Sequence, residues 1–600
     1  MQGVVFLKMC GICGTISREG RESNEDELRS MLPALSERGP DHRGVNLGRN
    51  FAFGHSRLSI IDLTEQGNQP MENKELGLVI TCNGEIYNYR ELREELKNYG
   101  YSFTSNSDIE VMMKAYDHWG ERFVERLMGM FAFCLYDRKK DKFILGRDRL
   151  GKKPLYYTEK NGTFYFASNI QALNDAGVVD QTLDRTALHY YLTFHAVVPA
   201  PRTIFSCVKK VEPGTVMTID RDGRKSLQRY WSLKMAVNKD LSEDDWVEAI
   251  LDKLRISVKR RMVSDVPVGA LLSGGVDSSL IVALMAELDI PDLRTYSIGF
   301  DTVNGEEGNE FYYSDIIARK YGTKHEKIYA DGEDLLPRVI DCLTFMAEPM
   351  VSHDAVGFFL LAREVSKKSR VVLCGQGADE IFGGYHWYPR IMESEGTSSP
   401  EQIYREQFFD RNHQEVLDTL DEKFHPEEDY SFKYVSDHFA GSESGTRGVE
   451  KALHIDTTVM LIDDPVKRVD NMTMAWGLEA RVPFLDHELV ELAASIPPEM
   501  KVKEGGKYIL KKAAEQVIPH EVIYRKKGYF PVPALKYMRG EFLEYARDIL
   551  YSDQAKERGL FNSQYLDRLF ENPAEQLTAL RGNKIWQAAV LEAWLQGMEG

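Results

Sequence analysis

Long hydrophobic runs are missing from this chain of 600 residues. A membrane-spanning helix needs roughly 20 consecutive apolar residues, and no stretch of the sequence approaches that length. The apolar run at residues 4–7 (VVFL) is too short for the hydrophobic core of a signal peptide. We therefore expect neither an export signal nor a membrane partner.

Cysteine is also scarce: the chain has seven, an odd number that is typical of a reducing cytoplasm rather than of a disulfide framework. Cys10 and Cys13 form a CxxC pair, but a zinc site would need two further ligands, and no second CxxC or HxxxH is present. A thioredoxin-like redox pair would follow a strand and open a helix, whereas this pair lies in a glycine-rich segment near the start of the sequence. The pair is otherwise two small, partly buried residues, and the composition indicates a cytoplasmic enzyme.

An excess of positive charge is absent as well. Lys and Arg number 75 against 93 for Asp and Glu, which gives a formal net charge of −18. This balance argues against nucleic acid as the main partner, although local basic residues can still bind small anions. Because 600 residues exceed what one hydrophobic core supports, we expect at least two domains.

The sequence changes character along its length. The first 200 or so residues read as short strands between turn signals, with amphipathic helices predicted at 89–100 and 107–120. A connection with a final hairpin is expected at 211–239, and strand–loop–helix units typical of a parallel α/β sheet follow. We predict an extension or misassigned start at residues 1–8, a first domain at 9–215 and a connection at 216–241. A second domain follows at 242–535, and a helical C-terminal part at 536–600.

The segment LLSGGVDSS, residues 271–279, is the sharpest motif. An apolar strand runs into Ser-Gly-Gly and then into a helix that begins near Asp277. Glycines let the backbone approach an anion, hydroxyls donate to it, and the helix N-terminus adds its positive end. The pattern predicts a phosphate site without the GKS or GKT of a Walker loop, the alternative being a generic glycine-rich turn.

A second acidic turn, GQGADEIFGGY at residues 375–385, again follows an apolar strand. Asp277 and Asp379 would then lie at two strand ends and could share a Mg²⁺ on a triphosphate. Solvated turn acids are the alternative interpretation. Lys507, in GGKYILKK, could meet pyrophosphate, although for this stretch by itself a solvated helix face is the better explanation.

Met9 is followed directly by Cys10. If Met9 were the true start, its removal would leave Cys10 with both a thiol and a free α-amine. The pKa of a free cysteine is about 8.5 and that of an α-amine about 7.7 to 8.0, so the two groups could exchange a proton near neutral pH. We therefore expect Met1–Lys8 to be a misassigned start or to be removed.

Together these motifs resemble the glutamine-dependent asparagine synthetase family. The resemblance runs from Met9 to about Pro533 in the family's order and rests on MCGICG, RGPD, HSRLSIIDL, NGEIYNY, SDIE, RDRLGKKPLYY, SGGVDSS, GADEIFGGY and LEARVPFLD. It implies an α/β multidomain protein, with an N-terminal Ntn-hydrolase αββα glutaminase sandwich (class II glutamine amidotransferase) followed by a parallel α/β PP-loop ATP pyrophosphatase domain. A homodimer is what the family suggests.

The resemblance also implies roles in the first domain. Cys10 would attack the glutamine carboxamide with its own α-amine as base. Asn83 and Gly84 would form the oxyanion hole, a contribution of roughly 3 to 4 kcal/mol per donor in comparable sites. Arg57 would bind the glutamine carboxylate, and its ammonium would meet two acids, Glu85 and Asp108.

In the second domain the resemblance implies ATP and Mg²⁺ as cofactors. ATP would contact Leu271, Ser273, Gly274, Gly275, Asp277, Ser278, Ser279, Ile298, Gly375 and Lys507. Mg²⁺ would be held by Asp277 and Asp379. A substrate carboxylate would attack the α-phosphate to give an acyl-adenylate and pyrophosphate. Ammonia released at Cys10 would reach that adenylate through the interior.

Two departures from the family pattern matter. A blocked Cys10 would lose its base, and the protein would then be a synthetase that takes free ammonia. The family's loop often reads SGEGSDE, but here Gln376 stands in the place of its Glu, and an amide cannot take a proton as a carboxylate can. The base is then elsewhere, with Glu348 in AEPMVSHDA as the candidate, or the acceptor is not aspartate.

The acceptor stays open at this point. The stretches VSHDAVGFFLL, YHWYP and KKGYFPVPALKYMRG also resemble a branch that amidates N-acetylglutaminylglutamine, a dipeptide osmolyte precursor. Aspartate is the commoner acceptor and is our expectation, with glutamine as the nitrogen donor. A glutaminase-only or non-enzymatic protein would be marked by loss of Cys10 or Asp277, and both are present.

Overall fold

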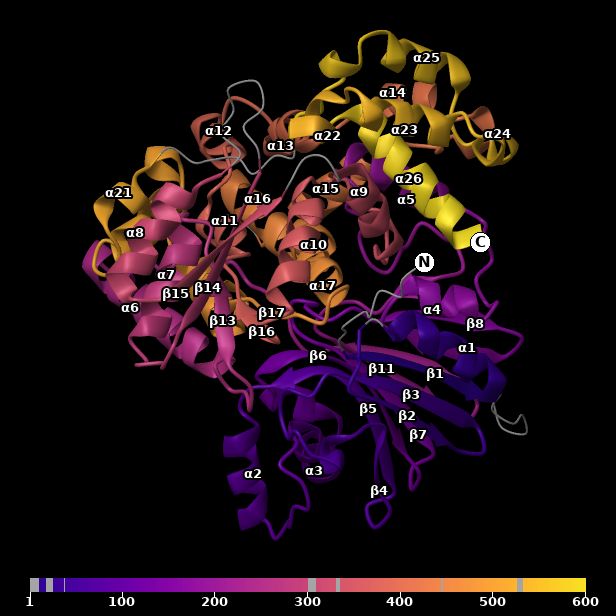
Figure 1. Cartoon of the computed structure of the whole chain (residues 1–600), viewed down its shortest axis with the longest axis vertical. Helices are drawn as coiled ribbons and strands as arrows, with labels where there is room; N and C mark the ends of the chain where they lie inside the picture. Colours follow the sequence, from indigo (N-terminus) through magenta and orange to yellow (C-terminus); the bar gives the residue numbers. More distant parts are fainter. Residues whose placement is uncertain are drawn as a thin grey trace.

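The computed structural model describes residues 10–17, 25–36, 38–300, 309–330, 335–443, 446–525 and 533–599. Within these residues the chain forms three sheets, two antiparallel and one parallel (Figure 1). The antiparallel pair makes up the first domain and the parallel sheet the second. This arrangement confirms the predicted fold class.

The first sheet has six strands in the order β10-β8-β9-β1-β3-β2. Their bounds are Lys209–Lys210, Tyr156–Lys160, Thr163–Ala167, Gly11–Ser17, Phe51–Arg57 and His42–Leu47. The second sheet has the order β12-β11-β7-β6-β5-β4. Its strands span Lys225–Arg229, Thr215–Asp220, Lys142–Arg147, Gly129–Asp137, Leu78–Ile86 and Met71–Asn73.

The two sheets pack face to face over an apolar layer. Ile12 and Phe53 from the first sheet meet Phe143 and Leu145 from the second, and all four are buried. Both β1 and β6 are buried along nearly their whole length because helices cover the outer faces. The helices α1 (Glu25–Leu35) and α4 (Ile170–Asp175) cover the first sheet, α3 (Asp108–Trp119) packs on the second, and α2 (Tyr89–Asn98) packs against α3 (Figure 1).

The two helices expected at 89–100 and 107–120 are α2 and α3. Ser107 caps α3 by accepting a hydrogen bond from the Ile109 N–H, and the helix stops at Gly120, whose φ of 62° suits glycine. The expected hairpin is β11–β12, but β11 pairs with β7, so the hairpin extends the sandwich beyond residue 215 to Arg229.

The third sheet has five parallel strands in the order β15-β14-β13-β16-β17. Their bounds are Lys324–Ala330, Arg294–Phe300, Val268–Leu271, Val371–Leu373 and Glu479–Arg481. The helices α6 (Glu243–Arg261), α7 (Val276–Ala286) and α8 (Phe311–Tyr321) lie on one side in Figure 1, and α9 (Leu335–Thr344) and α10 (Asp354–Val365) on the other. The strand order reverses between β13 and β16, and at such a switch point ligands bind at the carboxyl ends of the strands.

A long helical insertion separates β16 from β17. It comprises α11 (Ala378–Phe382), α12 (Trp387–Glu393), α13 (Pro400–Phe408), α14 (His413–Thr419), α15 (Tyr430–Ala440), α16 (Gly448–Ile455) and α17 (Lys467–Met474), with two short π-helical turns between α16 and α17. After β17 follow α18 (His487–Ser495), α19 (Pro498–Val502), α20 (Tyr508–Ala514), α21 (His520–Ile523), α22 (Pro533–Tyr537), α23 (Glu541–Leu550), α24 (Asp553–Arg558), α25 (Ser563–Glu571) and α26 (Lys584–Glu599).

The last helix returns to the first domain. Gln587 in α26 donates from Nε2 to the Tyr191 carbonyl at 2.9 Å, and the Tyr191 hydroxyl donates to the Gln587 carbonyl at 2.8 Å. Tyr191 lies in α5 (Arg185–Thr193). The C-terminal helices therefore bind the two domains together.

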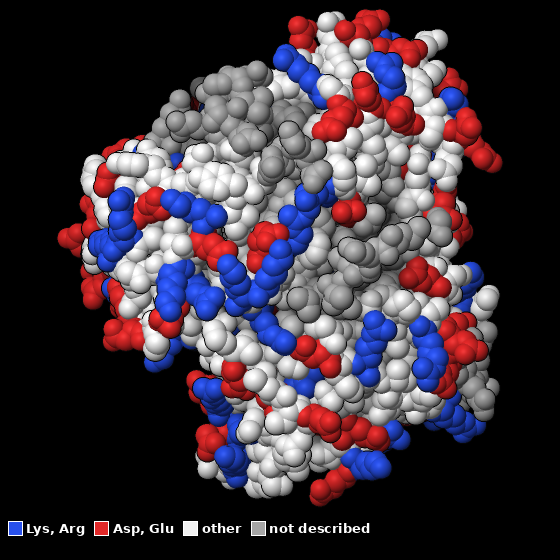
Figure 2. Space-filling view, in the orientation of Figure 1, with Lys and Arg blue, Asp and Glu red and all other residues white. Residues whose placement is uncertain are grey.

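Charged side chains of both signs are interspersed over the face drawn in Figure 2. Among the helices of the described residues, none is both long enough and apolar enough to cross a bilayer.

Candidate functional site

A first cluster of predicted site residues lies at the start of β1. Cys10 immediately precedes β1, and the pairing of Gly11 with Ser56 places it beside the end of β3. The Cys10 sulfur accepts a hydrogen bond from the Leu58 N–H at 3.1 Å. The thiol is thus held by backbone at one edge of the first sheet.

The Cys10 thiol is not ionised at neutral pH in this arrangement. Desolvation by the surrounding protein raises the pKa of Cys10 to about 12, and the nearby carboxyls of Glu85 and Glu479 also raise it. A thiol of this kind becomes a good nucleophile only if an adjacent base takes its proton as it attacks. The site needs such a base next to Cys10.

Asn83 and Gly84 lie on β5, opposite this thiol across the sandwich. Ser168 links the two strands, because its hydroxyl oxygen accepts from the Ile12 N–H at 3.0 Å and from Asn83 Nδ2 at 3.4 Å. Gly84 has a φ of 142°, and a Cβ there would lie 1.9 Å from the Met130 carbonyl oxygen, so only glycine fits. Sequence reasoning missed Ser168, since nothing in its local sequence marks it.

Arg57 ends β3 and is buried. Its Nη1 donates to the Thr64 carbonyl and to Asn68 Oδ1, both at 2.8 Å, and its Nη2 donates to the carbonyls of Ile61 and Asp62. These contacts fix the guanidinium against the loop after β3. Because they use both Nη atoms, a bound carboxylate would have to meet Nε or displace a carbonyl.

Glu85 and Asp108 are buried carboxyls that act on each other, and Glu85 also acts on the Cys10 thiol. Asp108 Oδ2 accepts from the Ile86 N–H at 2.9 Å, whereas Glu85 Oε2 has no hydrogen-bond partner among the described residues. Burial raises the pKa of Asp108 to about 6 and raises that of Glu85 well above its ordinary value. Two desolvated carboxyls of this kind favour a bound ammonium group.

This first cluster is joined to the second domain by a buried ion triad. Asp470 on α17 accepts from Arg38 Nη2 at 2.8 Å and from Lys153 Nζ at 3.1 Å. Arg38 also donates from Nε to the Cys10 carbonyl at 3.3 Å. Removing Asp470 would leave two buried cations without their shared carboxylate, so the triad ties the first domain to α17.

A cavity of about 540 Å³ lies at the switch point between β13 and β16. Most residues that the sequence assigned to ATP line it: Leu271, Ser273, Gly275, Asp277, Ser278, Ile298, Gly375 and Lys507. Gln376 and Asp379 line it too. Gly274 and Ser279 belong to the same turn and helix but do not line the cavity, and Ser279 is fully buried.

The turn before α7 has the features of an anion site. Gly275 precedes the helix, whose N-terminus faces the cavity, and the hydroxyls of Ser273 and Ser278 lie 3.0 Å apart. A Cβ on Gly375 would come within 3.0 Å of the Asp277 Cβ, so the two loops approach closely. A helix N-terminus with converging hydroxyls favours bound phosphate.

Lys507 stands between the two predicted metal-binding acids. Its Nζ lies 2.7 Å from Asp277 Oδ2 and 2.8 Å from Asp379 Oδ1. Burial alone would lower the pKa of this ammonium, but the two carboxylates raise it above its ordinary value. A Cβ on Gly384 would lie 2.0 Å from Asp379 Oδ1, so glycine leaves that oxygen room. Two carboxylates that converge on one cation are a donor set suited to Mg²⁺.

Glu348 is not placed with these groups. It lies outside the cavity lining, and its Oε2 accepts from Lys210 Nζ at 3.1 Å and from the Tyr156 hydroxyl at 3.3 Å. Asp463 binds the same Lys210 ammonium at 2.7 Å. Glu348 therefore belongs to a buried ion cluster between the domains, and the geometry does not support the role of base expected for it.

Other groups of the cavity were missed by the sequence interpretation. Tyr385 and Arg468 line it, and the Tyr385 hydroxyl donates to Glu380 Oε1 at 2.7 Å. Burial and the neighbouring Asp379 raise the pKa of Glu380 to about 7. The motif GADEIFGGY contains both Glu380 and Tyr385, so their spacing was the signal that could have paired them.

Comparisons with known proteins agree with this two-site architecture. The family model "Asparagine synthase" matches residues 249–596, and the family model "Glutamine amidotransferase domain" matches residues 9–231. "Asparagine synthetase [glutamine-hydrolyzing] 1" of Bacillus subtilis is 33% identical, with 98% of this chain and 96% of that protein covered. "Asparagine synthetase [glutamine-hydrolyzing] 3" of the same organism is 32% identical over 94% and 93%, and "Amidase chry2" of Gibberella zeae is 28% identical over 87% and 88%.

Proposed function

The chain belongs to the family of glutamine-hydrolysing asparagine synthetases, and from that premise we propose that it amidates aspartate through an acyl-adenylate. The family makes it an ATP-dependent ligase that takes its nitrogen from glutamine. The observation that supports the finer proposal is the contact of Asp277 and Asp379 with Lys507 beside the turn before α7. These three residues line a cavity of about 540 Å³, which we take to hold the nucleotide and the acceptor. The seven cysteines are free thiols, which supports the cytoplasm as the place of action.

In the first site, Cys10 Sγ would attack the carboxamide carbon of glutamine and pass its proton to a free α-amine. The tetrahedral oxyanion would be met by Asn83 Nδ2 and the Gly84 N–H. Collapse would release ammonia and leave a thioester, which water then hydrolyses to glutamate. The high pKa of the thiol supports a mechanism in which the base acts in the attack itself.

The pH dependence of glutamine hydrolysis should report Asp108. This carboxyl is ionised above its pKa of about 6 and neutral below it, and only the ionised form attracts the glutamine ammonium. The α-amine base already lowers kcat/KM below about pH 8. We therefore expect log kcat/KM against pH to steepen, from a slope of about one to about two, below pH 6.

The measurement is the pH profile of glutaminase kcat/KM in wild type and in Asp108→Asn. The variant should have a higher KM for glutamine and a single slope through that range. Because bound glutamine keeps the carboxyl ionised, kcat should steepen less than kcat/KM in the wild type. An unchanged second break in the variant would assign it to another group and contradict the proposal.

In the second site, ATP would lie along the turn before α7. Asp277 and Asp379 are the residues that would hold Mg²⁺, which when bound neutralises charge on the phosphates. The acceptor carboxylate would attack the α-phosphorus, the bond to pyrophosphate would break, and Lys507 would meet the departing pyrophosphate. Ammonia would then attack the acyl carbon, and AMP would leave with the amide formed and one proton lost.

That proton needs an acceptor, and Gln376 is neutral. We propose that Tyr385 and Glu380 supply the path. Tyr385 lines the cavity, and its hydroxyl donates to Glu380, whose raised pKa of about 7 suits a group that takes up a proton near neutrality. Glu380 would thus act through Tyr385 rather than on the adenylate directly.

Glu380→Gln and Tyr385→Phe should therefore have the same effect. Each is expected to slow amide formation by roughly 100-fold, the scale of general-base catalysis, and to leave acceptor-dependent exchange between pyrophosphate and ATP largely intact. Both reactions are measured on the same preparations with ammonium as the nitrogen source. Equal loss of exchange and amide formation would place the defect in ATP binding and not in proton transfer.

The acceptor is tested by pyrophosphate release with ATP, Mg²⁺ and glutamine, comparing aspartate with N-acetylglutaminylglutamine. The names of the two Bacillus relatives support aspartate. Release coupled to asparagine formation would establish it. Pyrophosphate release with the dipeptide alone would show that the cavity accepts the larger substrate. If neither acceptor caused pyrophosphate release while glutamine was still hydrolysed, both acceptor assignments would be wrong.

A further inference from the structure

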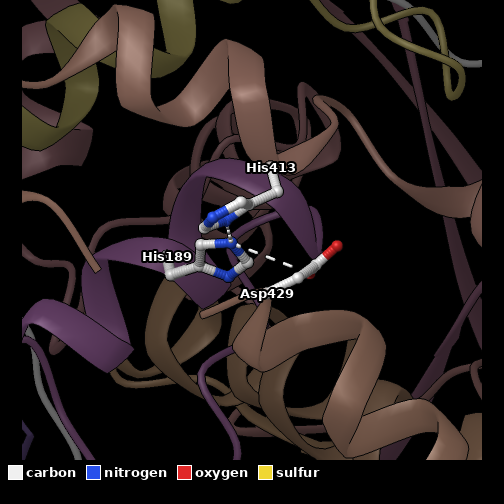
Figure 3. Close-up of side chains that lie close together, drawn as sticks. All are labelled: His189, His413 and Asp429. Carbon is white, nitrogen blue, oxygen red and sulfur yellow. Dashed lines mark hydrogen bonds and ion pairs between the residues drawn. The ribbon is translucent and has the colours of Figure 1, made fainter. Parts of the chain in front are cut away.

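Three side chains with metal-binding atoms, none of which lines the cavity described above, meet where α5 of the first domain packs on the helical insertion (Figure 3). His189 comes from the middle of α5, His413 opens α14, and Asp429 precedes α15 as its N-cap. One nitrogen or oxygen of each lies within 4.8 Å of the others. His189 is fully buried, whereas His413 and Asp429 are half-buried and leave a route from solvent.

The proton on His189 can be placed from its neighbours. The Thr193 hydroxyl donates to the His189 carbonyl at 2.7 Å, so toward the Ser431 hydroxyl it can only accept. Ser431 therefore donates to Thr193 and accepts from His189 Nδ1, which lies 2.9 Å away. His189 Nδ1 thus carries the proton, and Nε2 presents its lone pair.

That lone pair faces the two other ligands. His189 Nε2 is 3.1 Å from His413 Nδ1 and 3.7 Å from Asp429 Oδ1 (Figure 3). Ligands about 2.1 Å from a tetrahedral zinc ion are about 3.4 Å apart, so both separations bracket that value. The hydrogen bond from Nδ1 to Ser431 is the outer contact that usually orients a metal-binding histidine.

The charges of the cluster also favour a cation. Asp429 has no Lys or Arg ion-pair partner within the part of the chain that the structure describes, and its Oδ1 accepts only the Phe432 N–H at 3.0 Å besides facing His189. One carboxylate and two imidazoles are left to share whatever cation enters.

We propose that His189, His413 and Asp429 bind one divalent transition-metal ion, with Zn²⁺ the best match to two imidazoles and a carboxylate. The fourth position would be taken by water. This site is separate from the Mg²⁺ and ATP site and does not rest on the proposed function. Its ligands come from the first domain and from two helices of the insertion, so the ion joins the domains through α5, α14 and α15.

The test is titration of the chelator-treated, full-length protein with Co²⁺ and then Zn²⁺ in the presence of excess Mg²⁺, which occupies oxygen-rich sites. We expect one equivalent of Co²⁺ to give visible absorption of a four-coordinate ion, without the near-ultraviolet band of thiolate ligation, and Zn²⁺ to displace it. Zn²⁺ should also raise the melting temperature, because the ion binds only the folded chain.

Two variants separate binding from folding. Asp429→Asn keeps the N-cap of α15, since asparagine caps as well as aspartate, but removes the charged ligand. His413→Ala removes a half-buried ligand. Each should weaken Co²⁺ binding by about 100-fold or more and abolish the Zn²⁺ shift in melting temperature, while the metal-free melting temperature stays close to wild type.

Ser431→Ala is the matched control for orientation. It keeps all three ligands and loses the acceptor for His189 Nδ1 together with the hydrogen bond from Ser431 to Thr193, so Co²⁺ binding should weaken by roughly 10-fold to 100-fold. Stoichiometric binding that is unchanged in Asp429→Asn and His413→Ala would place the ion elsewhere and overturn the proposal. The proposal would also be overturned if the wild-type protein bound Co²⁺ no more tightly than exposed surface carboxylates do.

Discussion

Replacing Cys10 by alanine is expected to lower glutamine-dependent amidation by roughly 1,000-fold or more, while amidation driven by added ammonium continues. In the proposed mechanism Cys10 supplies the attacking atom, and neither the proposed oxyanion donors nor Glu85 and Asp108 could form the thioester without it. The measurement is pyrophosphate release with ATP, Mg²⁺ and acceptor, run in parallel with glutamine and with ammonium chloride at mildly alkaline pH.

Cys13→Ala is the matched control. Cys13 lies three residues further along the chain, in β1, is fully buried, and packs against Gly54 of β3 in the core. It should lose a little stability through the small cavity and keep both activities. If Cys10→Ala retained glutamine-dependent turnover, the nucleophile would be another group and the first-site mechanism would be wrong.

The same assay decides what residues 1–9 do. These residues lie outside the described part of the chain, so the expectation that they are absent from the active protein is tested chemically. We propose that a chain beginning at Cys10 hydrolyses glutamine and that one retaining residues 1–9 uses only ammonium. Intact mass identifies the first residue of each preparation, and glutaminase activity in the longer chain would contradict a role for the α-amine.

Much of both sites was readable from sequence because their residues sit in short, contiguous patterns. The run LLSGGVDSS contains a strand end, a glycine turn and a helix start within nine residues, and the cavity forms where those features predict it. Alternation and helical periodicity likewise located α2 and α3. Local patterns report local structure, and for these elements that was sufficient.

What failed depended on contacts between distant segments. Glu348 has a carboxyl of the right kind in the right domain, but Lys210 of the first domain binds it, and no sequence pattern links the two. The Arg38–Asp470 pair joins residues 432 positions apart. The β11–β12 hairpin looked like a connection because its pairing with β7 is invisible without the sandwich.

Replacing Asp379 by asparagine is the complementary prediction. Pyrophosphate release and amidation should fall roughly 100-fold to 1,000-fold with either nitrogen source, while glutamine hydrolysis stays within about twofold of wild type. Asp379 supplies one of two carboxylates that converge on Lys507 Nζ. Its loss would remove one of the two carboxylates proposed to hold Mg²⁺, and of the two acids that meet the buried ammonium only Asp277 would remain.

Asp292→Asn is the control for a mere loss of charge. Asp292 belongs to the same domain, its side chain is 70% exposed, and its partner is the exposed Lys324. An exposed pair of this kind contributes little, so activity and stability should both be unchanged. Comparing Asp379→Asn with Asp292→Asn shows whether activity depends on a carboxylate at position 379 or only on the net charge of the domain.

The melting temperature with and without ATP and Mg²⁺ is a second measurement on Asp379→Asn. ATP with Mg²⁺ should raise the melting temperature of the wild type and of Asp292→Asn, since a ligand that binds only the folded state stabilises it. In Asp379→Asn that rise should largely disappear although the melting temperature without ligand is close to wild type. If ATP with Mg²⁺ still raised the melting temperature of Asp379→Asn normally while activity was lost, the variant would bind the nucleotide but not turn it over. Asp379 would then act in the chemical step and not in holding the metal–nucleotide complex.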